Sequence, residues 1–481
     1  MTLIKTLFVS ASAMTMAACA TVGPDYQAPP VEPFTANALQ TDPALVAAKT
    51  EPAQRWWTAL ADETLDALVE KAFSENRDLR QAAANVEAAR AILRLERTNL
   101  RPTGEANAEY QRRKLAGSSF GIDDADFEGT NFFDVGLGAA WELDFFGRVK
   151  RQSEAARADA EGAAYLRRDA EALVAAETAR AYVDYRGAET RLAVARRNLE
   201  IQRETRALTQ TRFEEGLGSR LDVARAETQA KTTEASIPPL EAAGTAAANR
   251  LATLTGTPVA EIIALLAAGA PALPAPPDAL AVGDAESLLR RRADVRAAER
   301  ALAAATARIG VAKADYFPRI TLLGAVSASA QNLAGVGGDG SLGYGVGPSL
   351  SWSGFDIPRV KAGVKAADAR ADAAFAAYEQ TVLTALEETQ TALASYGRER
   401  VRFEALDDAA ATASEAADLA RERYDEGADD FLEVLDAESR LLAAEAALAE
   451  SQTAVASKFI SVYLALGAGW RSETLADDSK A

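Results

Sequence analysis

The feature that most constrains this chain is an internal duplication. Arg148-Val149-Lys150 recurs 211 residues later as Arg359-Val360-Lys361, and Gly256 recurs at the same offset as Gly467. Nearer the N-terminus the offset is 216, in a match that pairs Asp78, Arg80, Ala82 and Pro102 with Asp294, Arg296, Ala298 and Pro318. Loops tolerate insertions, whereas a packed pair of helices does not. The constant register therefore predicts two equivalent structural repeats, which tolerated a change of length between Pro102 and Arg148.

Each repeat contains a stretch that predicts a very long helix. Residues 148–213 hold no proline, and their only glycines are Gly162 and Gly187. As one helix they would reach about 100 Å, which a coiled coil or a tunnel wall needs and a globular domain does not. Alanine, which dominates the apolar residues, is the strongest helix former. We expect each repeat to run from a helix through two strands into the long helix, a glycine turn and a returning helix.

Two segments alternate in the way that membrane-spanning strands do. In residues 133–144 every second side chain is apolar, and residues 341–352 follow the same rule. Trp141 and Trp352 near the strand ends suit an aromatic girdle. A soluble sheet with one buried face would show the same alternation. The small and polar residues on the other face favour a water-filled lumen instead.

The number of strands requires more than one copy of the chain. Two hairpins give four strands, and open sheet edges cannot lie in hydrocarbon because their backbone groups would stay unpaired. About eight strands are the minimum for a barrel, and such a barrel is filled by its own side chains. A conducting pore therefore favours three copies and twelve strands. The loops at 115–128 and 331–341, rich in glycine, serine and aspartate, fit the outside of the cell.

The N-terminus carries an address for export. Residues 1–18 read as a signal peptide, and Met16-Ala17-Ala18-Cys19 resembles a lipobox, in which the cysteine receives fatty acyl chains such as palmitate. Ala20 after the cysteine resembles sorting to the outer membrane. The alternative is an ordinary small-residue cleavage site with an unrelated cysteine. It is disfavoured because the single cysteine stands where lipidation needs it.

Composition excludes several classes of function. The chain has no histidine and one cysteine, and its formal net charge is -18. Nucleic acid is not expected as a partner. An intrachain disulfide, an imidazole or thiolate metal site and Ser-His or Cys-His catalysis are excluded. Carboxylate catalysis stays formally open, but no paired acids stand in a catalytic setting. We expect a protein that is not an enzyme, with no cofactor and no metal.

Four motifs together resemble the outer-membrane efflux (TolC-like) family, in its NodT-like lipoprotein branch. They are Val22-Gly23-Pro24-Asp25-Tyr26, then Arg55-Trp56-Trp57, then Glu142 to Arg148, and finally Arg292 to Glu299 with Tyr316-Phe317-Pro318. The resemblance covers nearly the whole chain. It implies an α+β membrane protein, a homotrimer whose twelve-stranded β-barrel spans the outer membrane and whose α-helical barrel extends into the periplasm. It also implies a periplasmic adaptor and an inner-membrane pump of the resistance-nodulation-division type as partners.

On this reading the chain divides into consecutive segments. A lipidated and equatorial segment at 19–75 follows the signal peptide, and an equatorial linker at 257–290 separates two efflux repeats, 76–256 and 291–467, before a tail at 468–481. Strands are expected at about 103–144 and 319–353, and long helices at about 147–213 and 358–424. The function implied is the passive exit of drugs or other small solutes.

The helix turns are the candidate docking tips. Gly216 and Gly427 suit the left-handed conformation that ends a helix. By resemblance, adaptor hairpins dock at these positions, so Leu217 and Ala428 are candidate contacts.

Glu433 and Asp436 are the candidate periplasmic gate. Three residues apart, they share one face of a helix. By resemblance they line the periplasmic entrance, where threefold symmetry would gather six carboxylates that favour cations and bind divalent ions. A solvated acidic helix face is the simpler alternative.

The bonds that close the tip are predicted less completely. Asp222 and Tyr424 match family positions in those bonds. Asp429 stands where some members have a basic partner, so the lock must differ, and Arg220 is a possible substitute.

Two other functions share some of these features. A duct for protein secretion would have the same fold, although the lipobox and the Val22–Tyr26 opening favour solute efflux. A periplasmic coiled-coil adaptor or scaffold would share the long helices and lipid anchor, but would need neither the two hairpins nor the duplication.

Overall fold

The structure, a computed structural model, describes residues 21–30, 34, 46–48, 51–114, 128–428 and 430–471. The signal peptide, Cys19, most of the first predicted loop, Asp429 and most of the tail lie outside these ranges. The chain forms two compact units, one of residues 1–29, 85–163 and 297–378, and the other of residues 30–84, 164–296 and 379–481. Each unit therefore takes segments from both repeats.

Four helices run from one unit into the other. They are α4 (Arg77–Thr98), α5 (Arg148–Glu214), α9 (Ala293–Ala314) and α10 (Ile357–Asp425). The two longest, α5 with 67 residues and α10 with 69, occupy equivalent places in the two repeats. Among the described residues no single helix is long and apolar enough to cross a membrane. One sharply bent pair, α6 (Arg220–Thr255) with α7 (Val259–Ala268), is together long and apolar enough to do so, judged by length and composition alone.

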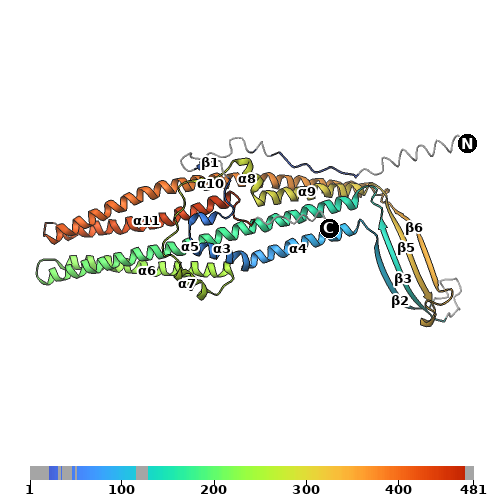
Figure 1. Ribbon diagram of the computed structural model, residues 1–481, viewed down its shortest axis with the longest axis horizontal. Helices are drawn as coiled ribbons and strands as arrows, with labels where there is room; N and C mark the ends of the chain where they lie inside the picture. Colours follow the sequence, from blue (N-terminus) through green and yellow to red (C-terminus); the bar gives the residue numbers. More distant parts are fainter. Residues whose placement is uncertain are drawn as a thin grey trace. The chain divides into compact units, whose positions relative to one another are not determined.

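The first unit contains a four-stranded antiparallel sheet. Its strands are β2 (Thr103–Arg113), β3 (Thr130–Glu142), β5 (Arg319–Ala330) and β6 (Leu342–Ser351), with η3 (Leu333–Gly335) between the last two. They lie side by side in the order β2-β3-β5-β6 (Figure 1). Each repeat thus supplies one hairpin, β3 pairs with β5 across the repeats, and β2 and β6 form the two edges.

The two faces of this sheet differ in chemistry. Leu137, Val326 and Tyr344 are register partners on three neighbouring strands, and they are 66, 46 and 85% exposed. On the other face Asp134 accepts hydrogen bonds from Asn107 Nδ2 and Ser329 Oγ, at 3.3 and 2.6 Å. The alternation read from the sequence thus separates an uncovered apolar face from a polar face.

The segment after Cys19 is fastened to the helices of the first unit. The amide of Val22 donates to the carbonyl of Phe146, and the buried Arg151 guanidinium donates to the carbonyls of Val22 and Gly23. A Cβ built on Gly23 would lie 2.4 Å from the Cα of Gly310 in α9. Two glycines therefore allow this close passage of backbone against helix.

The second unit surrounds an aromatic core. Its smaller elements are η1 (Trp56–Leu60), α3 (Glu63–Glu75), α8 (Ala285–Arg291) and a parallel pair of β1 (Val46–Ala48) with β4 (Leu280–Ala281). Trp56 and Trp57 are each 1% exposed. The Trp56 ring stacks on Tyr463 at 5.7 Å between centroids and meets Phe459 edge-on, both of them in α11 (Phe431–Ala465).

Ion pairs join the helices of the first hairpin, α5 and α6. Arg196 pairs with Glu241 at 2.7 Å and Arg203 pairs with Glu234 at 3.1 Å. All four side chains are largely exposed, so each pair contributes little stability. Together they set the antiparallel register of two helices whose facing side chains are mostly small.

We expect Trp57→Ala to lower the free energy of unfolding of the chain by about 3–5 kcal/mol, because it opens a large cavity in the aromatic core. The Trp57 ring packs edge-on against Phe73 at 5.6 Å. Unfolding in urea, followed by circular dichroism, measures the change. Val401→Ala, at a side chain 68% exposed, is the control. An equal shift in both variants would contradict the importance of this core.

Candidate functional site

The turn between α5 and α6 is closed by a glycine. Gly216 has φ +76°, and the amide of Leu217 donates to the carbonyl of Arg212 at 2.8 Å. No atom would lie within 4 Å of a Cβ at Gly216, so the backbone conformation alone demands glycine there. Ser219 then caps α6 in a reciprocal capping box with Asp222. Leu217, predicted as a docking contact, is 70% exposed.

The turn between α10 and α11 repeats this geometry. Gly427 has φ +74°, and the amide of Ala428 donates to the carbonyl of Arg423 at 2.8 Å. Ala428 is exposed, and Asp430 caps α11 by accepting from the amide of Leu432 at 2.7 Å. The duplication thus produces two equivalent tips.

The two predicted gate acids lie on the first turns of α11. Glu433 and Asp436 are both exposed. Asp436 pairs with Arg440 at 2.8 Å, four residues further along the same helix. Within the described residues the Glu433 carboxylate has no hydrogen-bond or ion-pair partner. The chain therefore offers two solvated carboxylates beside its second tip, one of them shared with an arginine.

Asp222 and Tyr424 have different surroundings. Asp222 accepts hydrogen bonds from the amide and hydroxyl of Ser219 and so stabilises the start of its own helix, α6. Tyr424 is 8% exposed and packs against Phe431 at 5.7 Å. The Arg212 guanidinium lies 4.2 Å from the centre of the Tyr424 ring. It also donates a hydrogen bond to the backbone carbonyl of Tyr424 at 2.9 Å. Within one chain, Tyr424 is therefore fixed by Arg212, a contact that the sequence did not predict.

A second contact between the hairpins was also missed from the sequence. The Glu438 carboxylate is 4% exposed and accepts from Arg421 Nε at 3.0 Å and from Thr205 Oγ1 at 2.9 Å. Thr205 belongs to the first hairpin and Arg421 to the second. We call these two contacts, Arg212 with Tyr424 and Glu438 with Arg421 and Thr205, the hairpin latch.

One signal in the sequence could have revealed Glu438. Val434 and Leu441 lie four residues before it and three after it, and both are buried. That spacing puts Glu438 on the same helical stripe. A carboxylate on a buried stripe needs a partner, because burying an unpaired charge is costly.

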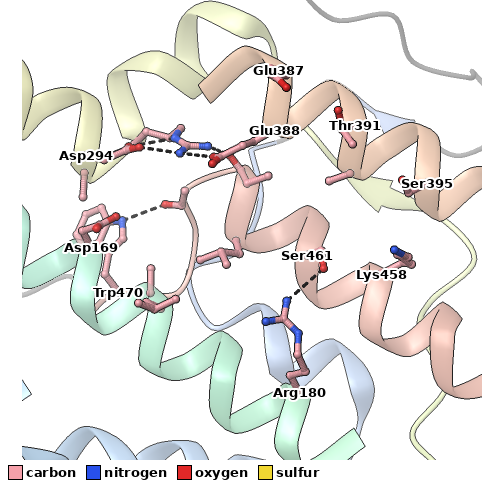
Figure 2. Close-up of a pocket in the computed structure, with 18 residues that line it drawn as sticks. Asp169, Arg180, Asp294, Glu387, Glu388, Thr391, Ser395, Lys458, Ser461 and Trp470 are labelled. Atoms are coloured by element: carbon pink, nitrogen blue, oxygen red, sulfur yellow. Dashed lines mark hydrogen bonds and ion pairs between the residues drawn. The ribbon is translucent and has the colours of Figure 1, made fainter. Parts of the chain in front are cut away.

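A cavity of about 580 Å³ lies in the second unit, where α5, α10 and α11 meet the start of α9. One end carries Asp169, Asp294 and Trp470, and the other carries Lys458 and Ser461 (Figure 2). Arg292, 8% exposed, bridges Asp294 and Glu388 at 2.6 and 2.7 Å. The residues of this cavity come from four separate segments of the chain, so no local pattern in the sequence predicts it.

Asp169 is the perturbed acid of the cavity. Burial and the nearby carboxylates of Asp294 and Glu388, opposed by Arg292, together raise the pKa of its carboxyl to about 6. Among the described residues, no three histidine, cysteine or acidic side chains are grouped so that they could hold a metal ion.

Comparison with known proteins identifies the family. The model of the family described as outer membrane efflux protein matches residues 68–257 and 285–468. The chain belongs to the outer membrane efflux protein family.

Relatives of this efflux protein match it along nearly their whole length. Nodulation protein T of Rhizobium leguminosarum bv. trifolii is 33% identical over 457 residues, 93% of this chain and 94% of that protein. Outer membrane protein OprJ of Pseudomonas aeruginosa is 33% identical over 470 residues, 95% and 94% of the two chains. The solved outer-membrane channel OprN has a TM-score of 0.83 at 38% identity, and the match covers 94% of this chain and all of that one.

The efflux protein is thus an outer-membrane channel of a tripartite efflux pump, and it extends into the periplasm. The relatives are channel and efflux proteins and not enzymes. The tips, the gate acids, the latch and the cavity therefore belong to a conduit for solutes.

We expect Asp169→Asn to stabilise this efflux protein at pH 7.5, with a gain that shrinks as the pH falls. The folded state raises the pKa of Asp169 above its unfolded value of 3.8, so the wild type loses stability as the pH rises from about 4 through 6. Asparagine removes that loss. Melting temperatures of both proteins between pH 4 and 8 measure the effect. A lower melting temperature at pH 7.5, or a difference that does not change with pH, would contradict the assignment.

Proposed function

We propose that three copies of this efflux protein form one duct across the outer membrane. The observation that supports this proposal is the four-stranded sheet. Its apolar face is uncovered, and its edge strands β2 and β6 have no further partner among the described residues. Hydrocarbon does not tolerate open sheet edges. Four strands are too few for a barrel, and three copies give twelve, enough for an aqueous lumen.

The long helices would continue the duct below the membrane. In each copy, α5 with α6 and α10 with α11 form two hairpins of similar length. Six such hairpins give a wall of twelve helices. The lipidation of Cys19 would hold each copy at the inner leaflet. The fastened segment from Val22 onward would connect that anchor to α5 and α9.

The cargo and the partners follow from the family. Relatives include the toluene efflux pump outer membrane protein TtgF of Pseudomonas putida and the antibiotic efflux pump outer membrane protein ArpC of Pseudomonas putida. These names support drugs or other small solutes as cargo. A periplasmic adaptor would dock at the exposed tips around Leu217 and Ala428. An inner-membrane pump of the resistance-nodulation-division type would supply the energy, because flow through a duct is passive.

The acids at the second tip would form the periplasmic gate. Three copies of Glu433 and Asp436 place six carboxylates around the entrance. Arg440 offsets part of the charge of Asp436, so Glu433 carries more of the cation preference. Divalent ions would bridge carboxylates of neighbouring copies and close the entrance.

The hairpin latch would hold the gate shut from within each copy. It joins the first hairpin to the second through Arg212, Tyr424, Glu438 and Thr205. Opening the entrance by moving one hairpin away from the other requires these contacts to break. Gln or Ala at one of these positions therefore tests the gate separately from the carboxylate ring.

Neutralising the ring should open the entrance to ions. In planar bilayers we expect the wild type to give a small, cation-selective current that divalent cations block. Glu433→Gln with Asp436→Asn should raise the current and abolish the block, since the carboxylates that attract the ions are gone.

The matched control for this experiment is Glu404→Gln with Asp408→Asn, which removes two exposed carboxylates from α10 away from the tip. If both double variants conduct and respond to divalent cations like the wild type, the duct stands and the acidic gate is wrong.

Breaking the latch should also raise the current. Glu438→Ala removes the hydrogen bond from Thr205 that joins the first hairpin to a buried charge of the second. Such a bond contributes about 1.5–3 kcal/mol, so the ratio of closed to open channels should fall by about tenfold or more. Glu234→Ala breaks a comparable ion pair within the first hairpin and is the control. Equal single-channel conductance and open probability in the wild type and both variants would refute a role of the latch in gating.

A further inference from the structure

The cavity of the second unit has a size and lining suited to a small molecule. Its volume of about 580 Å³ lies within the range of ligand pockets in proteins, which is roughly 300–1,000 Å³. Seven of its 18 lining residues are apolar, and charged and polar side chains complete the wall, among them Asp169 at one end and Lys458 at the other (Figure 2). The apolar lining residues are Ala172, Leu173, Ala293, Ala392, Leu464, Ala465 and Trp470.

The cavity opens on the helix faces that point away from the aromatic core. In α11, Ser461 lines the cavity and Tyr463 lies in the core. In α5 the corresponding pair is Leu173 and Ala175, and in α10 it is Thr391 and Leu393. Residues two apart on a helix point about 200° apart. All three helices thus present one face to the core and the opposite face to the cavity.

Most charges of the cavity are already paired within the chain. Arg292 holds Asp294 and Glu388. Arg180 pairs with Glu177 at 2.8 Å and also donates to Ser461 at 3.3 Å. These groups build the walls and leave their charges largely compensated.

Three charged groups are exceptions. Within the described residues, the carboxylates of Asp169 and Glu387 and the ammonium group of Lys458 have no hydrogen-bond or ion-pair partner, and Glu387 and Lys458 are exposed. Figure 2 shows Asp169 and Lys458 at opposite ends of the cavity, Asp169 beside Trp470 and Lys458 near Ser395. A buried carboxylate without a partner is unfavourable, which accords with the raised pKa of Asp169. A ligand with a positive group at one end would relieve that cost.

We propose that this cavity is a binding site for small zwitterions. The protonated amine would lie against Asp169, the carboxylate against Lys458, and the apolar body between them along Leu173 and Leu464. A cation alone would leave Lys458 unmatched, and an anion alone would leave Asp169 unmatched. The placement of the site on the inner wall of the duct rests on the proposed function and on the further proposal that the helix faces away from the aromatic core line the tunnel.

The binding test uses simple probes that differ only in charge. 4-(Aminomethyl)benzoate carries both charges across one ring, and 4′-(aminomethyl)biphenyl-4-carboxylate separates them further. Benzylamine and benzoate carry one charge each. Titration calorimetry on the full-length protein in detergent at pH 7.5 should show at least one zwitterion binding about tenfold more tightly than either singly charged probe.

Two variants assign the ends of the ligand. Asp169→Asn should weaken the zwitterion about tenfold and abolish the preference for benzylamine over toluene. Lys458→Met should also weaken the zwitterion about tenfold, and it should abolish the preference for benzoate over toluene. Lys365→Met and Asp408→Asn, both at exposed residues outside the cavity, should leave binding unchanged. Melting temperatures confirm that every variant is folded.

The outcomes separate this site from the duct. Folded protein that binds none of the probes, or binds them equally in the wild type and the two cavity variants, would overturn the site. A zwitterion that binds and transiently blocks the single-channel current supports both the site and its place in the tunnel. Binding without any effect on a measurable current overturns that placement. If the folded protein carries no current, the duct itself fails, and calorimetry still decides the site.

Discussion

The packing of Trp56 against helix α11 and of Trp57 against helix α3 is the interaction on which the second unit depends. Trp56 and Trp57 sit on a short 3-10 helix, and their rings contact Phe459, Tyr463 and Phe73. Each aromatic ring buries far more apolar surface than an alanine. In helices made mostly of small residues, this cluster therefore fixes how α5, α10 and α11 turn about their axes. The cavity on their opposite faces is a direct consequence.

Small side chains serve different purposes in the two units. In the second unit they let long helices lie close together over many turns, and ion pairs such as Arg203 with Glu234 set the register. In the first unit glycines make room on the polar face of the sheet, where a Cβ at Gly136 would lie 2.6 Å from Asn107 Oδ1. The same compositional bias thus supports a helical wall and a sheet with an open polar face.

The two tips show how a duplication yields equivalent shapes with different chemistry. Gly216 and Gly427 close their turns in the same backbone conformation. Around them, however, the first tip presents Leu217 and a capping box, whereas the second presents Ala428 and the acids of α11. The hairpin latch uses side chains from both repeats of one chain. Thr205 and Arg212 come from the first repeat, and Arg421 and Glu438 come from the second. At the offset of 211, Arg212 and Glu438 keep the same residue type in the other repeat, whereas Thr205 and Arg421 do not.

The sequence by itself determined the elements and the family. Period-two alternation, long runs without proline and a constant offset between repeats are local or one-dimensional signals. They were sufficient to place the strands near Leu137 and Tyr344, the long helices, and the glycine turns. Helical spacing puts the exposed acids Glu433 and Asp436 on one face, and the family resemblance singled them out among the many acids of the chain.

Only the tertiary structure decided which side chains meet. Arg212 reaches Tyr424, and Glu438 joins Thr205 to Arg421, because two hairpins more than 200 residues apart in sequence pack together. Asp169 acquires its raised pKa from burial and from the nearby carboxylates of Asp294 and Glu388. Pairing, burial and electrostatic environment depend on distances in space, and no periodicity along the chain encodes them. The latch and the cavity could therefore be recognised only once the helices were packed.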